Sequence, residues 1–206
     1  MNKGNIYLGG FMAAGKTSVG RELARSMGRP FIDTDEVIER RTGKSISAIF
    51  SEEGEPFFRS LERALLKELV QIRGVVISLG GGILADRELR QMIIDTGSLV
   101  VLSVQPETVM ERVRSEKGKR PLLEKEDLRS FWERRLPAYE EAHFKICTDG
   151  RTVGDISDEI RDLFQFIPSG PVSPLSCLHC IAGNGDYPVM IGKNILCTFQ
   201  EKMKRN

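Results

Sequence analysis

A glycine-rich segment near the start of the chain, GGFMAAGKTS at residues 9–18, has the residue types and spacing of a phosphate-binding loop. The pattern G-x-x-x-x-G-K-S/T is matched at Gly10, Gly15, Lys16 and Thr17. In such a loop the backbone N–H groups point inward, the lysine binds the β- and γ-phosphates, and the threonine hydroxyl can bind Mg²⁺. The alternative is a glycine-rich turn without a ligand, but the complete pattern favours nucleotide binding.

A second group of chemically useful residues lies in FIDTDEV, where Asp33 and Asp35 follow a short apolar segment. Two carboxylates two positions apart point the same way in an extended segment. We expect Asp33 to bind the metal ion through water and Asp35 to orient or deprotonate an attacking hydroxyl. The alternative is structural: Asp35 caps a helix that begins at Glu36, and Asp33 faces solvent.

These residues need strands and helices that bring them together. Nearly continuous apolar segments, typical of strands covered on both faces, predict strands at 5–9, 30–33, 75–80, 98–104 and 144–149. Helical spacing predicts helices at 16–27, 35–50, 54–73, 86–95, 106–115, 127–142 and 152–165. This alternation predicts an α/β fold with a five-stranded parallel sheet flanked by helices.

The bulk composition fits an ordinary globular protein of 206 residues, with 40% apolar and 29% charged residues. The formal net charge of +1 provides no global attraction to nucleic acid or acidic membranes, so we expect neither partner. No apolar segment approaches the roughly 20 residues of a membrane span, and we find no secretory signal. The four cysteines form no disulfide framework and indicate a reducing, cytoplasmic compartment.

The composition changes after residue 166. The segment IPSGPVSPLS has three prolines and three serines in ten residues, which is typical of a linker. We therefore predict a first domain at 1–166, a linker at 167–186 and the start of a second domain at 187–206. Cys177 and Cys180 have the spacing of half a metal site, but no second pair follows, so a metal site is disfavoured.

Further motifs make the chain resemble a shikimate kinase, a small phosphate-loop kinase of the aromatic amino-acid pathway. They run in order over roughly residues 4–165: GGFMAAGKTS, FIDTDEVIE, FFRSLE, SLGGG, KRPLL and RRLPAYEEA. The resemblance implies the fold of P-loop NTPases and nucleoside monophosphate kinases. It also implies transfer of the γ-phosphoryl group of ATP to the 3-hydroxyl of shikimate with Mg²⁺, in a monomer.

The resemblance implies roles for residues around the nucleotide. Lys16 and Arg120 would spread the charge of the transferring group, with Arg120 in a lid formed by SEKGKRPLL at 115–123. Asp35 would act on the acceptor hydroxyl, and Arg112 and Arg151 are expected near the adenine. We assign ATP binding to Ala13, Ala14, Gly15, Lys16, Thr17, Ser18, Arg120 and Arg151.

The resemblance also implies an acceptor pocket. Shikimate carries a carboxylate, to which Arg59 and Arg135, on two different helices, would donate bidentate hydrogen bonds. Glu62, one turn after Arg59, could hold that guanidinium in place; the alternative is an ordinary surface ion pair. Three successive glycines would leave room for the ligand. We assign acceptor binding to Asp35, Arg59, Gly81, Gly82 and Arg135.

The chain departs from the family pattern at two positions. Ala13 stands where most shikimate kinases have a glycine, and Val153 stands where a proline is frequent. Neither change removes a phosphate or metal contact, so we expect effects on nucleotide affinity rather than on the reaction.

Two alternative functions remain open from the sequence. One is another small-metabolite P-loop kinase, such as a gluconate kinase, and the other is a module that senses shikimate without turnover. The intact Lys16, Thr17 and Asp35 argue against the sensor. The segment YPVMIGKNIL at 187–196 resembles the opening strands of 3-dehydroquinate synthase, which would make the chain one half of a bifunctional fusion.

Overall fold

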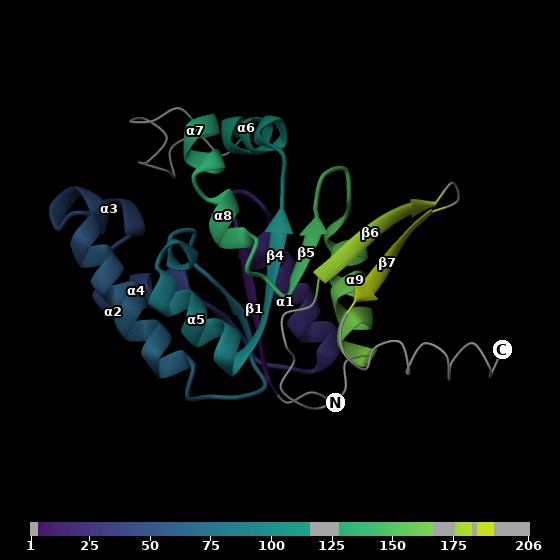
Figure 1. Ribbon diagram of the computed structural model, residues 1–206. Coiled ribbons are helices and arrows are strands. Elements are labelled where there is room, and N and C mark those ends of the chain that lie inside the picture. Colours follow the sequence, from purple (N-terminus) through teal and green to yellow (C-terminus); the bar gives the residue numbers. More distant parts are fainter. Residues whose placement is uncertain (1–3, 116–127, 167–175, 183–184, 192–206) are drawn as a thin grey trace.

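The computed structural model describes residues 4–115, 128–166, 176–182 and 185–191. Its centre is a five-stranded sheet with the strand order β2-β3-β1-β4-β5 (Figure 1). All four neighbouring pairs are parallel, which confirms the predicted fold class. The strands are β1 (Asn5–Gly10), β2 (Phe31–Asp33), β3 (Val76–Ser78), β4 (Gly97–Ser103) and β5 (Phe144–Cys147).

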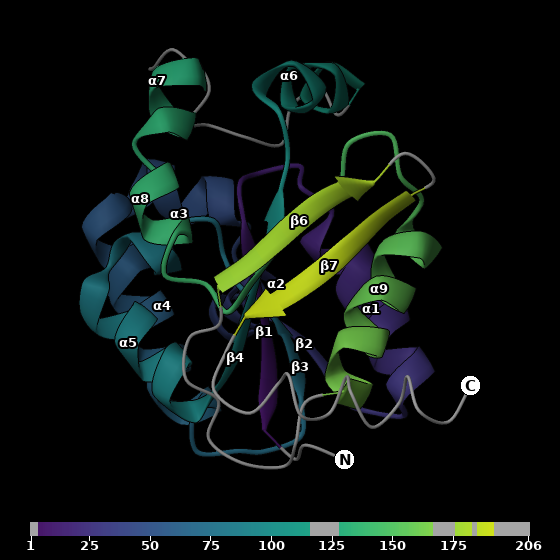
Figure 2. The ribbon, with the colours of Figure 1, turned by 45° about the vertical axis from the view of Figure 1, so that its right-hand side comes forward.

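Helices cover both faces of the sheet. Helices α1 (Lys16–Met27) and α9 (Val153–Phe166) lie on one face, and α4 (Glu55–Leu69) and α5 (Arg87–Thr96) lie on the other, as Figures 1 and 2 both show. Side chains on β1 alternate between two hydrophobic cores: Ile6 and Leu8 pack in the core under α1 and α9. Tyr7 packs in the core under α4 and α5. Strand β1 is therefore buried on both sides.

The remaining helices lie beside or beyond the ends of these layers. Helices α2 (Thr34–Thr42) and α3 (Ile46–Glu52) contact α4. A 3₁₀ turn, η1 (Ile83–Ala85), follows β3. Helices α6 (Pro106–Ser115), α7 (Leu128–Glu133) and α8 (Leu136–Tyr139) lie toward the end of the sheet where β4 and β5 finish (Figure 1). The chain leaves β1 toward β2, on one side of the sheet, and leaves β3 toward β4, on the other side of β1. In an open α/β sheet, ligands usually bind in the crevice beyond the carboxyl ends of the strands at the point where the strand order reverses in this way.

Two predicted helices are divided in the structure. The helix predicted at 35–50 is wrong, because Gly43 has a φ of 68° and its N–H bonds to the Glu39 carbonyl, which ends α2. Ser45 then caps α3 by accepting a hydrogen bond from the Ala48 N–H. The helix predicted at 127–142 is also wrong. Helix α7 ends at Glu133, a short turn follows, and α8 then begins with a proline in its own first turn. Proline lacks the N–H that a continuous helix would need.

Residues beyond the large sheet form a second, two-stranded antiparallel sheet of β6 (Ser176–Ala182) and β7 (Gly185–Ile191). Strand β6 lies within the range expected as a linker, and the division into domains stays a prediction. Within the described ranges, no helix is both long enough and apolar enough to cross a membrane.

Candidate functional site

The phosphate-binding loop joins β1 to α1, as the sequence predicts. Gly10 has a φ of 136°, and a Cβ there would lie 2.5 Å from the carbonyl oxygen of Leu102 on the neighbouring strand. Gly15 has a φ of 89° and directly precedes α1. Both positions therefore require glycine, one for lack of space and both for backbone conformation.

The start of α1 is suited to an anion. The N-cap residue is Gly15, so no side chain caps the first N–H groups of the helix, and its first turn has no acidic residue. The first N–H groups of a helix have no partner within the helix and lie at the positive end of its dipole. The Lys16 ammonium donates to the carbonyl oxygens of Gly10, at 3.1 Å, and Phe11, at 2.9 Å. The loop, the helix start and Lys16 together form a site of positive potential.

Asp33 links this loop to strand β2. Its Oδ2 accepts a hydrogen bond of 2.7 Å from the Thr17 hydroxyl. Its Oδ1 accepts from the backbone N–H groups of Asp35, at 3.0 Å, and Glu36, at 3.4 Å. Asp33 is therefore the N-cap of α2, and the alternative in which Asp35 caps a helix beginning at Glu36 is wrong. The extended segment ends at Asp33, so the expectation that both aspartates share one extended segment is wrong as well.

Asp35 lies in the first turn of α2, with its Oδ1 buried and without a hydrogen-bond partner in the described structure. Burial, and then the neighbouring Asp33 carboxylate, raise the pKa of Asp35 to about 6, while Lys16 and Arg59 oppose that rise. Asp35 is thus within electrostatic reach of both the phosphate loop and the arginine expected to bind the acceptor. A carboxyl group with a pKa close to neutrality is well matched to accepting a proton.

Arg59, on α4, is held between two glutamates. Its Nη1 donates to Glu62 Oε2 at 2.6 Å, while its Nε and Nη2 donate to Glu55 Oε1 at 3.0 and 2.7 Å. Three of the five guanidinium donors are used in these bonds, which leaves one on each terminal nitrogen. Arg59 can therefore offer a fixed pair of donors to a carboxylate.

Glu62 is a buried residue and not part of a surface ion pair, because its side chain is only 1% exposed. Burial raises the pKa of Glu62 to about 7 despite the Arg59 charge, and its Oε1 has no partner in the described structure. The sequence indicates the Arg59–Glu62 spacing, but it gives no signal that the carboxylate is buried.

The three glycines after β3 have different environments. A Cβ at Gly80 would lie 2.5 Å from Glu62 Oε1 and 2.6 Å from Asp35 Oδ1, and one at Gly82 would collide with the Arg59 guanidinium. A Cβ at Gly81 would meet nothing within 4 Å. A side chain at Gly80 or Gly82 would therefore displace Glu62, Asp35 or Arg59, and of the three glycines only Gly81 borders open space, a distinction that the sequence could not make.

Arg135 approaches the same loop from the segment before α8. Its Nη1 donates to the Gly82 carbonyl at 3.4 Å, and its guanidinium carbon lies 4.9 Å from the centre of the Phe131 ring. Burial lowers the pKa of Arg135, and the Arg59 charge lowers it further. Two guanidinium groups thus converge on Gly82, an arrangement that favours an anionic ligand between them.

The other predicted ATP-binding residues lie around the loop or outside the described ranges. Ser18 is exposed in the first turn of α1, and Ala14 is buried. Arg151 binds Glu159 and the carbonyl oxygen of Cys147. Arg112 donates to backbone carbonyls, including that of Ala13. Arg120 and most of the predicted lid at 115–123 lie outside the described residues.

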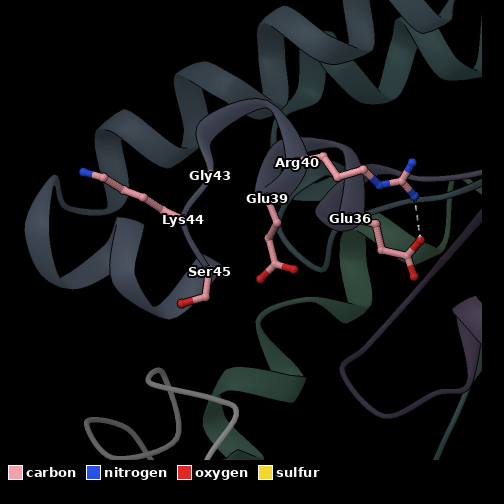
Figure 3. A pocket seen from close by; sticks show the side chains of 6 residues that line it. All are labelled: Glu36, Glu39, Arg40, Gly43, Lys44 and Ser45. Atoms are coloured by element: carbon pink, nitrogen blue, oxygen red, sulfur yellow. Dashed lines mark hydrogen bonds and ion pairs between the residues drawn. The ribbon is translucent and has the colours of Figure 1, made fainter.

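A separate surface pocket of about 440 Å³ lies between α2 and α3 (Figure 3). Its charged groups already have protein partners: Glu36 pairs with Arg40, Lys44 with Glu52, and Glu39 accepts from the Ile46 N–H. We therefore place the functional site at the phosphate loop and not in this pocket.

Known proteins are similar to this chain over most of the residues described above. The family model for shikimate kinase matches residues 12–165. A shikimate kinase of Thermus thermophilus is 44% identical over 159 residues, covering 75% of this chain and 86% of that protein. One of Persephonella marina is 39% identical and covers 76% of this chain and 96% of that protein. The structure of a shikimate kinase from Acinetobacter baumannii in complex with shikimate matches with a TM-score of 0.75 at 39% identity, covering 79% of this chain and 93% of that one. The chain belongs to the shikimate kinase family.

Proposed function

We propose that the protein transfers the γ-phosphoryl group of ATP to the 3-hydroxyl of shikimate, which yields ADP and 3-phosphoshikimate. One observation carries the proposal: Asp35 lies between the phosphate loop and the acceptor region. Asp33, which caps the helix of Asp35, accepts from Thr17 of the loop, and a Cβ at Gly80 would touch both Asp35 and Glu62, the partner of Arg59. A kinase needs such a group between donor and acceptor, because the attacking hydroxyl must lose its proton there.

The nucleotide is bound by the loop and the start of α1. We assign the phosphate contacts to the backbone of Ala13, Ala14 and Gly15, together with Lys16, Thr17 and Ser18. In this assignment the Lys16 ammonium exchanges the carbonyl oxygens of Gly10 and Phe11 for phosphate oxygens, which carry more negative charge. Arg151 is proposed to lie near the adenine, on sequence grounds.

Mg²⁺ fits the donor set beside the loop. The oxygens of Thr17 and Asp33 are the hard ligands that Mg²⁺ prefers, and they lie 2.7 Å apart. No group of three or more His, Cys, Asp or Glu side chains among the described residues could hold a metal ion. We propose that Thr17 binds the ion directly and Asp33 through water. When bound with ATP, the ion neutralises charge on the β- and γ-phosphates.

The acceptor is bound on the other side of Asp35. Arg59 and Arg135 would bind the shikimate carboxylate, because their guanidinium groups converge on Gly82. Gly81 borders open space and would allow the ring to approach the backbone. Glu62 fixes the Arg59 guanidinium, so that the carboxylate is bound in one orientation.

In the proposed step the 3-hydroxyl oxygen bonds to the γ-phosphorus, while the bond from that phosphorus to the β–γ bridging oxygen breaks. The hydroxyl proton passes to the Asp35 carboxylate, and ADP leaves. Lys16 stabilises charge on the transferring group. We assign the same role to Arg120, which lies outside the described residues.

The test is ADP release from MgATP with shikimate, quinate, gluconate, AMP or no acceptor. We expect strong stimulation by shikimate alone. Stimulation by gluconate or AMP would replace shikimate with another acceptor. ATP binding without stimulation by any acceptor would favour the sensor function, and Lys16→Ala provides the matched control for phosphoryl transfer at this site.

Several further proposals rest on the sequence alone. We propose a monomer in a reducing, cytoplasmic compartment, with residues 187–206 as the start of a domain similar to 3-dehydroquinate synthase. A fusion of that kind would place two activities of one pathway on one polypeptide.

A further inference from the structure

The phosphate loop contains a residue in an unfavourable backbone conformation. Ala13 has a φ of 56°, and it is the one non-glycine residue with a positive φ in the described part of the chain. A hydrogen bond of 3.3 Å from the Ala14 N–H to the Phe11 carbonyl closes a turn over residues 11–14, with Ala13 in third position. A positive φ at this position alone is typical of a type II turn, which favours glycine there. A side chain in this conformation persists only where neighbouring groups hold it.

Arg112 is the neighbouring group that holds Ala13. From α6, its Nη1 donates to the Ala13 carbonyl oxygen at 2.9 Å and its Nη2 donates to the Thr148 carbonyl oxygen at 3.2 Å. The Ala13–Ala14 peptide is thus bonded at both ends, by Arg112 at its carbonyl and by the Phe11 carbonyl at its N–H.

Thr148, the second residue that Arg112 bonds, is itself held in place by the sheet, so Arg112 forms a bridge between the loop and Thr148. Thr148 is buried, and its N–H and hydroxyl both donate to the Ser103 carbonyl, at 2.9 and 3.2 Å. The next residue, Asp149, accepts from the Gln105 N–H just before α6. Arg112 therefore connects the loop to Thr148, just after β5, and Thr148 is itself bonded to Ser103 at the end of β4.

We propose that Arg112 is a positioning residue for the phosphate loop, which holds the Ala13 peptide in its left-handed conformation and so directs the loop N–H groups toward the phosphates. This inference rests on the proposed function in one respect, namely that the loop binds the phosphates of ATP. Without the bridge to the Ala13 carbonyl, the Ala13 backbone can relax to a negative φ, and the N–H groups of the loop beside it then change direction.

This role differs from contact with the adenine, which the sequence led us to expect for Arg112. A residue that stacks on the base affects ligands that have a base. A residue that holds the loop affects any ligand with phosphates, and its loss is corrected by a residue that accepts a positive φ without strain. Glycine at position 13 is such a residue.

The experiment is a calorimetric titration of Mg-tripolyphosphate and of MgATP into the wild type, Arg112→Ala, Ala13→Gly and the double variant. We expect Arg112→Ala to weaken tripolyphosphate binding about tenfold, since it removes hydrogen bonds from a charged group. Ala13→Gly provides the background in which the bridge is not needed, and the double variant should bind within about threefold of Ala13→Gly, because the two changes are coupled. Arg25→Ala, which removes an exposed arginine of α1, is the matched control.

Two results would overturn the proposal. The first is unchanged tripolyphosphate binding in Arg112→Ala with weakened MgATP binding, which would assign Arg112 to the base. The second is a loss in Arg112→Ala that Ala13→Gly does not restore. If Arg112→Ala fails to fold, Arg112→Lys serves the same comparison, because one ammonium cannot reproduce the guanidinium fork. The titration contains no acceptor, so an error in the proposed reaction would leave its result unaffected.

Discussion

The hydroxyl of Thr17, in the first turn of α1, donates a hydrogen bond of 2.7 Å to Oδ2 of Asp33, at the end of β2. This bond joins the phosphate loop to the strand that carries the acidic residues. Asp33 also caps α2, so the helix that holds Asp35 begins at the same carboxylate. The position of the proposed base is therefore tied to the position of the proposed metal ligands.

Thr17→Val removes this hydroxyl with little change in shape. We expect the KM for MgATP to rise roughly tenfold or more, because both the proposed Mg²⁺ ligand and the bond to Asp33 are lost. Steady-state kinetics at varied Mg²⁺ concentration will measure the effect. Thr17→Ser keeps the hydroxyl and should remain close to the wild type. Equal behaviour of the two variants would exclude the hydroxyl as a ligand.

Asp35→Asn tests the proposed base. Turnover with shikimate should fall by about a hundredfold or more, because an amide cannot accept the hydroxyl proton. The Kd for MgATP, measured by calorimetry, should stay near that of the wild type. Asp95→Asn changes an exposed aspartate of α5 and controls for loss of a surface charge. Near-normal turnover in Asp35→Asn would remove Asp35 from the mechanism.

The raised pKa of Asp35 predicts the pH dependence of the reaction. Because the ionised form accepts the proton and its pKa is about 6, kcat/KM for shikimate should decline as the pH falls through about 6. A carboxyl resonance that titrates in this range and disappears in Asp35→Asn, followed by ¹³C NMR, will identify the group. A flat profile down to pH 5 would contradict the assignment.

The raised pKa of Asp35 also makes the stability of the fold depend on pH. The folded protein binds a proton at Asp35 more tightly than the unfolded chain does, so this group lowers the free energy of unfolding as the pH rises from about 4 through about 6. Asp35→Asn should therefore unfold at higher temperature than the wild type at pH 8, with a gain on the order of 2 kcal/mol. The difference should shrink near pH 4.

Arg59→Ala tests the acceptor pocket. The KM for shikimate should rise about tenfold or more, with a much smaller change in the KM for ATP, since only the acceptor carboxylate is proposed to meet Arg59. Glu62→Gln is a useful companion, because the amide oxygen can still accept from Arg59 Nη1. A matched rise in both KM values for Arg59→Ala would argue against the carboxylate contact.

Gly80 and Gly81 form a pair with opposite expectations. Gly80→Ala should lower the free energy of unfolding by about 1–3 kcal/mol, because its Cβ would press on Glu62 and Asp35. Gly81→Ala should unfold near the wild-type temperature, because its Cβ meets nothing, but it should raise the KM for shikimate. Thermal unfolding and kinetics of the two variants will separate these effects. A stable, active Gly80→Ala would show that the carboxylates move easily.

The sequence was informative wherever a local pattern determined the structure. The phosphate loop, all five strands of the large sheet and the start of α1 follow from residue spacing, since these elements depend on glycine positions and on short buried segments. The helix break at Gly43 was missed because a glycine inside a helical pattern does not always end a helix.

What the sequence could not provide depends on contacts between distant segments. Asp33 caps α2 while it binds Thr17, and nothing in FIDTDEV distinguishes this from capping by Asp35. The burial of Glu62 depends on the packing around the loop after β3, and Ala13, one of the partners of Arg112, lies 99 residues away in the chain. Such relationships depend on the tertiary structure and not on local spacing.

The alternation of side chains along β1 also places the two halves of the proposed site on different hydrophobic cores. Phe11 and Ala14 of the phosphate loop belong to the core shared with α1 and α9. Phe58 next to Arg59, and Ile83 after the glycines, belong to the core shared with α4 and α5. The proposed donor and acceptor sites therefore draw mainly on different cores, and strands β1, β3 and β4 separate the two. We therefore expect substitutions in the core under α4 and α5 to change acceptor affinity more than nucleotide affinity, which would let the acceptor side diversify while the nucleotide side changes less.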